Sequence, residues 1–166
     1  MPGYRDVFAS LNDAGIRYVV VGGVAVVLQG HARMTVDLDL VIDLAVEPAL
    51  ATLDVLADMG FRPRLPVPAK DFADPSIRAG WVSQRNLQVF SFFDPGDALR
   101  EIDLFATHPV PFEDMVADAD HVDLGGLDVP VASIPHLLLL KRAAGRPQDA
   151  ADVVALTGLL EAREKR

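Results

Sequence analysis

The chain contains no cysteine among its 166 residues, so disulfides and thiolate metal sites are excluded. It also lacks a long apolar run. The longest, YVVVGGVAVVL from Tyr18 to Leu28, is interrupted by two glycines and is far shorter than the roughly 20 residues of a membrane span. The first segment, MPGYRDVFAS, has no apolar stretch of the signal-peptide type. These absences predict a cytoplasmic protein with no membrane segment.

Positive charge is scarce as well. Lys and Arg number 15 against 24 Asp and Glu, which gives a formal net charge of −9. Binding to nucleic acid without sequence preference depends on many basic contacts to phosphates, so we expect no extended nucleic-acid footprint. A local contact with an RNA end stays open if Lys70, Arg78 and Arg85 form a patch.

The residues that are present predict one compact unit. At 51% hydrophobic and 23% charged residues, the composition is that of a globular protein, and the length fits a single domain over 1–166. Apolar spacing and glycine or proline stops then predict the order of elements. Expected helices cover 4–14, 24–30, 48–59 and a short stretch near 111–119, and expected strands cover 16–21, 36–43, 86–93 and 100–107, followed by two short strands around Gly125-Gly126. We place the core at about 16–132 and a pair of C-terminal helices, separated at 145–147, at about 133–163.

The segment 62–85 shows no clear periodicity and contains four prolines. A loop of this length is uncommon inside a compact domain and is often a lid or a binding segment. A plain connection with a short strand or turn is the equally good alternative.

Two of the expected strands carry acids on one face and apolar residues on the other. In VDLDLVID, period-two alternation places Asp37, Asp39, Val41 and Asp43 opposite the apolar row Val36, Leu38, Leu40 and Ile42. In REIDLF, Glu101, Asp103 and Phe105 lie opposite Ile102 and Leu104. If the two strands are neighbours, Asp103 faces Asp37 and Asp39.

Three converging carboxylates repel one another and are costly to desolvate, a conflict that a divalent cation resolves. Oxygen ligands favour Mg²⁺ or Mn²⁺, and the four histidines show no zinc-site spacing. Magnesium held by a few carboxylates usually completes its shell with water and substrate phosphates, which indicates a nucleotide. The pair Gly22-Gly23, between a strand and a helix, lets the backbone approach a phosphate closely.

These motifs resemble a known family. VGGVAVVLQGHARMTVDLDL followed by EIDLF is similar to the nucleotidyltransferase fold of the polymerase-beta superfamily. The ending KRAAGRPQDAADVVAL is similar to the C-terminal motif of abortive-infection nucleotidyltransferase toxins and their uncharacterised relatives. The resemblance implies an α+β fold, with a mixed β-sheet flanked by helices and a C-terminal helical pair.

The resemblance also implies an activity: transfer of an NMP from an NTP substrate to a hydroxyl acceptor with Mg²⁺ or Mn²⁺. Asp37, Asp39 and Asp103 would be the catalytic residues and metal ligands, and Asp103 would help to deprotonate the acceptor. The acceptor would be a tRNA end, a protein or a small molecule, and the protein would belong to a toxin–antitoxin or defence system with a cognate toxin or antitoxin as partner.

Phosphate binding is assigned to Gly22, Gly23, Arg33, Lys141 and Arg146. Many superfamily members carry a serine at the position of Gly23, so backbone N–H groups and basic side chains would replace it. Lys141 would act as a point charge, and Arg146 would pair with phosphate or with Asp149 or Asp152.

Simpler interpretations remain for several of these residues. Solvent exposure in an unrelated protein is the alternative explanation of the acidic strand faces, against which the spacing of Gly22-Gly23 and the presence of Asp103 argue. Asp43 and Glu101 are interpreted as surface acids. Lys141, Arg142, Asp149 and Asp152 suit the helix dipoles where they lie. The alternative function of a different class is a catalytically silent module that binds a nucleotide or a protein.

Overall fold

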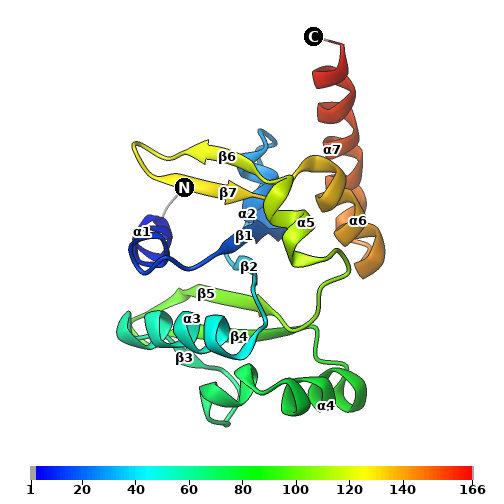
Figure 1. Ribbon diagram of the computed structural model, residues 1–166. Coiled ribbons are helices and arrows are strands. Elements are labelled where there is room, and N and C mark those ends of the chain that lie inside the picture. The colour runs from blue at the N-terminus through cyan, green and yellow to red at the C-terminus, as the bar shows by residue number, and fades with distance from the viewer. Residues whose placement is uncertain (1–2, 166) are drawn as a thin grey trace.

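The computed structural model describes residues 3–165, which form a mixed arrangement of helices and strands (Figure 1). In chain order the elements are α1 (Arg5–Asp13), β1 (Tyr18–Val21), α2 (Gly22–Leu28), β2 (Leu38–Ile42), α3 (Val46–Asp58), β3 (Arg62–Pro63), the 3-10 helix η1 (Ala69–Ala73), α4 (Pro75–Arg85), β4 (Val89–Asp94), β5 (Asp97–Phe105), α5 (Phe112–Ala117), β6 (Asp120–Asp123), β7 (Asp128–Val131), α6 (Ile134–Ala144) and α7 (Asp149–Glu164).

The strands form one seven-stranded sheet in the order β3-β4-β5-β2-β1-β7-β6. The pairs β2–β5 and β1–β7 are parallel, and the other neighbours are antiparallel. The expected hairpin of β4 and β5 is confirmed. The expected α+β fold with a mixed sheet flanked by helices is therefore confirmed.

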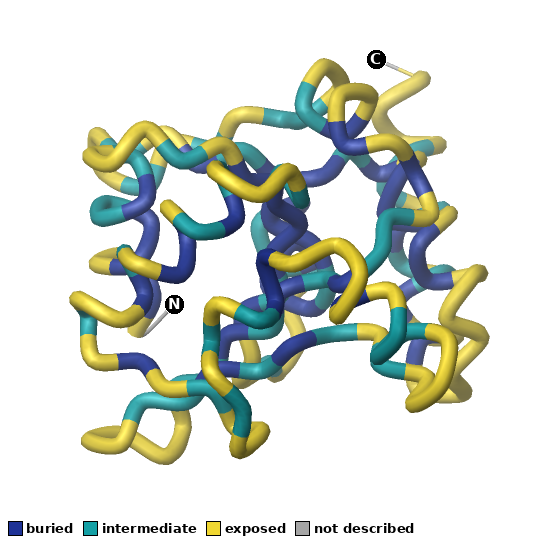
Figure 2. The backbone as a smooth tube through the Cα atoms, turned by 60° about the horizontal axis from the view of Figure 1, so that its bottom comes forward, coloured by how far each residue is buried: buried dark blue, intermediate teal, exposed yellow. Residues whose placement is uncertain are grey.

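The central strands β1 and β2 are buried at all but one position, and the buried residues, dark blue in Figure 2, gather in the interior of the molecule. Every residue of β1 is buried, as its continuous apolar sequence predicts for a strand covered on both faces. Neighbouring β2 is apolar and buried except at Asp39, which is partly exposed. A polar side chain at this position therefore lies in the middle of the protein.

The strand β2 begins later than the sequence predicts. We expected it to span 36–43 with Val36 on the buried face, but it starts at Leu38 and 48% of Val36 is exposed. Pairing with β1 ends at the contact between Val21 and Asp39. Beyond that point the Val36 carbonyl accepts a hydrogen bond from the Tyr4 hydroxyl at 2.7 Å. Val36 is therefore held by Tyr4, the residue before α1, and not by strand pairing.

The segment 62–85 is largely ordered as β3, η1 and α4, and the helix α4 was not predicted. The Asp74 carboxylate caps it by accepting hydrogen bonds from the N–H groups of Ser76 and Ile77, and Pro75 occupies its first turn. Arg78 is buried and donates to the Phe72 and Leu44 carbonyls. The basic patch that would include Arg78 is therefore wrong, because this guanidinium is used inside the fold.

The C-terminal part follows the expected order. The Ser133 hydroxyl accepts the His136 N–H at the start of α6, and Gly145 ends this helix in the left-handed conformation. Helices α6 and α7 then pack against each other at one end of the molecule, away from α3 and α4 (Figure 1). Within residues 3–165, no helix is long and apolar enough to cross a membrane.

Candidate active site

Asp39 and Asp103 form the centre of the candidate site. They are register partners on the neighbouring parallel strands β2 and β5, so their side chains emerge side by side on one face of the sheet. The apolar residues on either side of each acid are fully buried and hold both strands in place: Leu38, Leu40, Ile102 and Leu104. The predicted convergence of these two acids is thus present in the structure.

The two carboxylates are held in an environment that disfavours their charge. Burial, followed by the charges of Asp103 and Asp37, raises the pKa of Asp39 to about 7. Burial also raises the pKa of Asp103, and the side chain of Ser91, its neighbour on β4, opposes this shift. The Asp103 Oδ1 atom is buried and has no hydrogen-bond partner among the described residues. Such a pair calls for a positive group.

Asp37 lies just before β2 and is exposed. Its charge contributes to the raised pKa of both Asp39 and Asp103, so it lies near the pair. In the described part of the chain, however, no three Asp, Glu or His side chains are close enough to form a complete metal site by themselves. The structure brings two of the three predicted acids together and leaves the third at their edge.

This donor set fits Mg²⁺ or Mn²⁺ bound together with substrate. Magnesium is usually held by one or two carboxylates plus substrate phosphates, and does not need a cage made entirely of protein. Asp39 and Asp103 supply two carboxylates, one of which has an unpartnered buried oxygen. A role for Asp37 as a third ligand stays a prediction.

The two glycines before the site leave room that a side chain would fill. Gly22 has a φ of +65°, and a Cβ placed there would lie 1.9 Å from Asp39 Oδ2. A Cβ on Gly23 would lie 2.4 Å from the Thr35 hydroxyl oxygen. Glycine at position 22 is therefore required both by the backbone conformation and by the close approach of Asp39. Thr35, which we did not select from the sequence, occupies the space beside Gly23.

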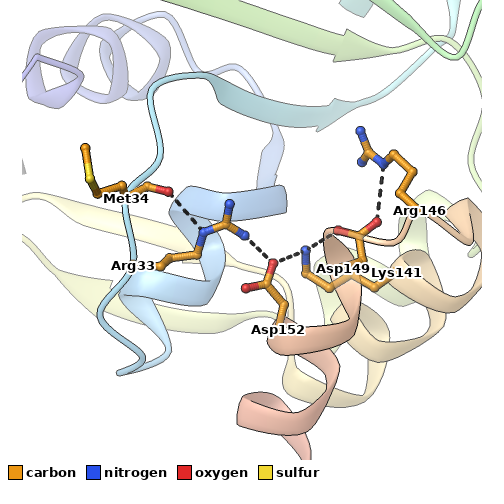
Figure 3. Close-up of polar contacts among 6 residues, drawn as sticks. All are labelled: Arg33, Met34, Lys141, Arg146, Asp149 and Asp152. Atoms are coloured by element: carbon orange, nitrogen blue, oxygen red, sulfur yellow. Dashed lines mark hydrogen bonds and ion pairs between the residues drawn. The ribbon is translucent and has the colours of Figure 1, made fainter.

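The predicted phosphate-binding cations already have carboxylate partners (Figure 3). The buried Lys141 Nζ lies 3.0 Å from Asp149 Oδ1 and 2.6 Å from Asp152 Oδ2. Arg33 forms an ion pair with Asp152, and Arg146 Nε lies 3.2 Å from Asp149 Oδ2. These contacts join α6, α7 and the segment before β2 into one charged network, and phosphate binding by its cations stays a prediction.

A cavity of about 580 Å³ opens beside the acidic pair. Five of the predicted site residues line it: Gly22, Asp39, Asp103, Lys141 and Arg146. Gly23, Arg33 and Asp37 are not among its lining residues. The remaining lining includes two amide side chains between α4 and β4, Asn86 and Gln88, and apolar side chains from β4, β5 and α6, notably Val89, Phe105, Leu137 and Leu140. Its size is typical of a site for a small molecule.

Two charged residues near the acids were not selected from the sequence. Glu101 lies two residues before Asp103 on the same face of β5, and its charge raises the pKa of both Asp103 and Asp37. Arg64 forms an ion pair with Glu101, stacks over Phe93 at 5.3 Å from the ring centre, and lowers the same pKa values. The alternation along β5 could have identified Glu101, whereas Arg64 comes from the irregular segment after β3.

Comparison with known proteins gives no match in sequence and clear matches in structure. Neither a family profile nor a curated protein matches the chain. The fold resembles that of ANT(2″)-Ia in complex with adenylyl-2″-tobramycin, with a TM-score of 0.62 at 13% identity over 95% of this chain and 87% of the other. The lincomycin-bound lincosamide antibiotic adenylyltransferase LnuA has a TM-score of 0.62 at 13% identity, over 93% and 94% of the two chains.

A third similar structure is an antigenic nucleotidyltransferase-like protein from Paracoccidioides brasiliensis. Its TM-score is 0.59 at 19% identity, over 93% of this chain and 73% of the other. Together with the paired acids on β2 and β5, these matches define the class: the chain has the nucleotidyltransferase fold. At these identities the likeness concerns the fold.

Proposed function

We propose that the protein is a metal-dependent nucleotidyltransferase that moves an NMP from an NTP to a hydroxyl acceptor. The observation that carries the proposal is the Asp39–Asp103 pair, which lines a cavity large enough for a small molecule. Their raised pKa values and the unpartnered Asp103 oxygen are the features expected of ligands for a divalent cation.

In the proposed reaction the acceptor hydroxyl oxygen attacks the α-phosphorus of the NTP. The bond between this phosphorus and the bridging oxygen of the β-phosphate breaks, and pyrophosphate leaves. The proton of the hydroxyl passes to Asp103, whose pKa is raised by burial. Bound Mg²⁺ would stabilise the negative charge on the attacking and leaving oxygens. Asp37, Asp39 and Asp103 would hold it, while Gly22, Gly23, Arg33, Lys141 and Arg146 would contact phosphate.

A small hydroxylated molecule is the acceptor that we favour. The net charge of −9 disfavours a polyanion such as tRNA, and one basic side chain of the suggested RNA patch, Arg78, is buried. Two proteins of similar fold are antibiotic adenylyltransferases or carry an adenylylated antibiotic. A protein or a tRNA end remains the competing acceptor.

The C-terminal sequence motif supports a proposed role in a toxin–antitoxin or defence system. The motif contributes Lys141, Asp149 and Asp152 to the charged network of α6 and α7. A cognate toxin or antitoxin would then be a partner of this protein in the cytoplasm.

One observation favours a second function. Lys141 and Arg33 are neutralised by carboxylates, which weakens the positive field available to a triphosphate. A catalytically silent module that binds a nucleotide or a protein could function with this weaker positive field, because it does not have to hold a triphosphate for reaction.

The decisive experiment is label transfer. The protein is incubated with each α-³²P-labelled NTP, Mg²⁺ and separate pools of tRNA, cell protein and hydroxylated small molecules, including aminoglycosides and lincosamides. We expect one pool to become labelled, and Asp39→Asn to abolish the labelling. Asp43→Asn is the matched control, because Asp43 lies just after β2 and pairs with Arg17 at 2.9 Å. NTP binding without transfer to any pool would favour the silent module.

A further inference from the structure

An amide pair lies at the cavity, between the end of α4 and the start of β4. Asn86 and Gln88 both line the cavity and are exposed at its edge. Gln88 Nε2 donates to Asn86 Oδ1 at 2.9 Å. No other hydrogen bond to a described residue is made by either side chain. Gln88 Oε1 and Asn86 Nδ2 thus remain available as an acceptor and a donor.

The backbone holds this pair in an unusual conformation. Asn86 has a φ of +51°, the only positive φ of a non-glycine residue within residues 3–165. It ends α4, and the next N–H, that of Leu87, donates to the Trp81 carbonyl at 3.2 Å. Asparagine tolerates the left-handed region better than most residues. The backbone of Asn86 is therefore held at a defined position between α4 and the first residue of β4.

The adjoining cavity wall is apolar. Val89 and Phe105 are register partners on β4 and β5, and both line the cavity. They lie two residues beyond the Ser91–Asp103 pair, which corresponds to roughly 7 Å along the strands. Leu137 of α6 contributes to the same lining. The cavity thus runs from carboxylates to an aromatic and aliphatic wall that ends at the amide pair.

We infer that Asn86 and Gln88 bind the edge of the nucleotide base and select adenine over guanine. The inference rests on the proposed function, since a nucleotide with its phosphates at Asp39 and Asp103 would extend its base toward the apolar wall. A side-chain amide offers a donor and an acceptor together, the pattern that pairs with the amino group and ring nitrogen of adenine. The matching edge of guanine presents two acceptors, which Arg or Lys reads best.

The basic side chains that line the cavity are not placed to recognise guanine. Lys141 and Arg146 are the only Lys or Arg residues in the cavity lining of the described chain, and both contact Asp149. Neither belongs to the segment 86–89 that carries the amides. The base-binding end of the cavity is therefore neutral, and its hydrogen-bonding groups favour ATP over GTP.

The test measures binding of non-reactive α,β-methylene analogues of ATP, GTP, CTP and UTP by calorimetry with Mg²⁺. Two variants remove the amides: Gln88→Ala, and Asn86→Gly, which keeps the left-handed backbone accessible. Gln84→Ala, in an exposed residue of α4 outside the cavity lining, is the matched control. We expect the wild type to bind the ATP analogue about tenfold more tightly than the GTP analogue. Gln88→Ala and Asn86→Gly should remove this difference, and Gln84→Ala should retain it.

The outcomes separate the two proposals. Equal affinity of the wild type for the four analogues, or a preference that survives both amide substitutions, overturns the base-reading role and leaves the proposed function intact. No binding of any analogue, together with an unchanged melting temperature in Mn²⁺, overturns the proposed function as well. Circular dichroism of each variant checks that a loss of affinity does not reflect unfolding.

Discussion

Asp39 and Asp103 are direct neighbours across the parallel strands β2 and β5. The pKa of each carboxyl group is raised, mainly by burial. A fold that placed these acids here without a ligand would lose stability through their burial and mutual repulsion. The surrounding apolar residues nevertheless keep both strands fixed in this register. Under the proposed function, a bound cation would balance the charge of this pair.

The first prediction concerns the stability of Asp39→Asn. At pH 8 without metal, we expect this variant to unfold at a higher temperature than the wild type, because it removes an unfavourable buried charge. Mn²⁺ should raise the melting temperature of the wild type and leave that of Asp39→Asn unchanged. Differential scanning fluorimetry with and without MnCl₂ measures both effects. Asp43→Asn should retain the metal response, and an equal response of Asp39→Asn would contradict a metal site at β2.

The second prediction is a pH dependence of stability. The pKa of Asp39 is raised from 3.8 to about 7 by folding, so the folded state keeps a proton that the unfolded chain releases between these values. The free energy of unfolding of the metal-free protein should therefore fall as the pH rises from about 4 to about 7, and this contribution should level off above pH 7. The contribution of Asp39 is on the order of a few kcal/mol.

Chemical denaturation at a series of pH values measures this dependence. Asp39→Asn should flatten the curve over the same interval. Stabilisation by Mg²⁺ should change in the opposite direction and increase toward pH 7, because a metal ion binds the deprotonated carboxylate. A wild-type curve that rises from pH 4 to pH 7 with the slope lost in Asp39→Asn would contradict the raised pKa.

The sequence was most informative about which face of a strand each side chain occupies, because the two-residue period of the backbone decides this. Period-two alternation alone placed Asp39 and Asp103 on one face of their strands, and the continuous apolar run of β1 predicted its complete burial. The prediction for Val36 was wrong because the start of β2 is set by its partners: pairing with β1 stops at Asp39 and pairing with β5 stops at Leu38. Alternation shows which face a residue would occupy in a strand, but it does not show where the strand ends.

The features that the sequence did not predict depend on tertiary contacts. The helix α4 has a cap at Asp74 and a proline in its first turn, but its weak apolar periodicity is compensated by contacts of the buried Arg78 with two distant carbonyls. Arg64 is brought beside Glu101 by the pairing of β3 with β4, which no local pattern indicates. The ion pairs of Lys141 likewise depend on the packing of α6 against α7.

The third prediction tests what Lys141 does. Its ammonium group is buried between Asp149 and Asp152, so Lys141→Met leaves two buried carboxylates with fewer partners. We expect a loss of about 3–5 kcal/mol in the free energy of unfolding. Arg142→Met, in the adjacent exposed residue of α6, should cost less than about 0.5 kcal/mol.

Urea denaturation of both variants gives the comparison. A cost for Lys141→Met as small as that for Arg142→Met, combined with a large rise in the KM for NTP, would contradict the structural role. It would instead show that Lys141 acts only through the proposed contact with phosphate and not by stabilising the fold. The variant Lys141→Met with Asp149→Asn should recover part of the lost stability, since it removes one of the unpaired carboxylates.

The last prediction distinguishes two effects of a side chain at Gly22: the contact of its Cβ with Asp39, and the strain of a positive φ. Gly22→Ala places a Cβ 1.9 Å from Asp39 Oδ2 in a backbone with φ +65°, so we expect Asp39 to be displaced and nucleotidyl transfer to fall at least a hundredfold. Gly15→Ala is the matched control, because Gly15 has nearly the same φ, +68°, and nothing within 4 Å of its added Cβ. Both variants pay the cost of a left-handed alanine, about 1–2 kcal/mol, and should show that loss in denaturation experiments. Only Gly22→Ala should also lose the Mn²⁺-dependent rise in melting temperature. Equal metal responses in the two variants would mean that the contact between Gly22 and Asp39 is unimportant for the metal site.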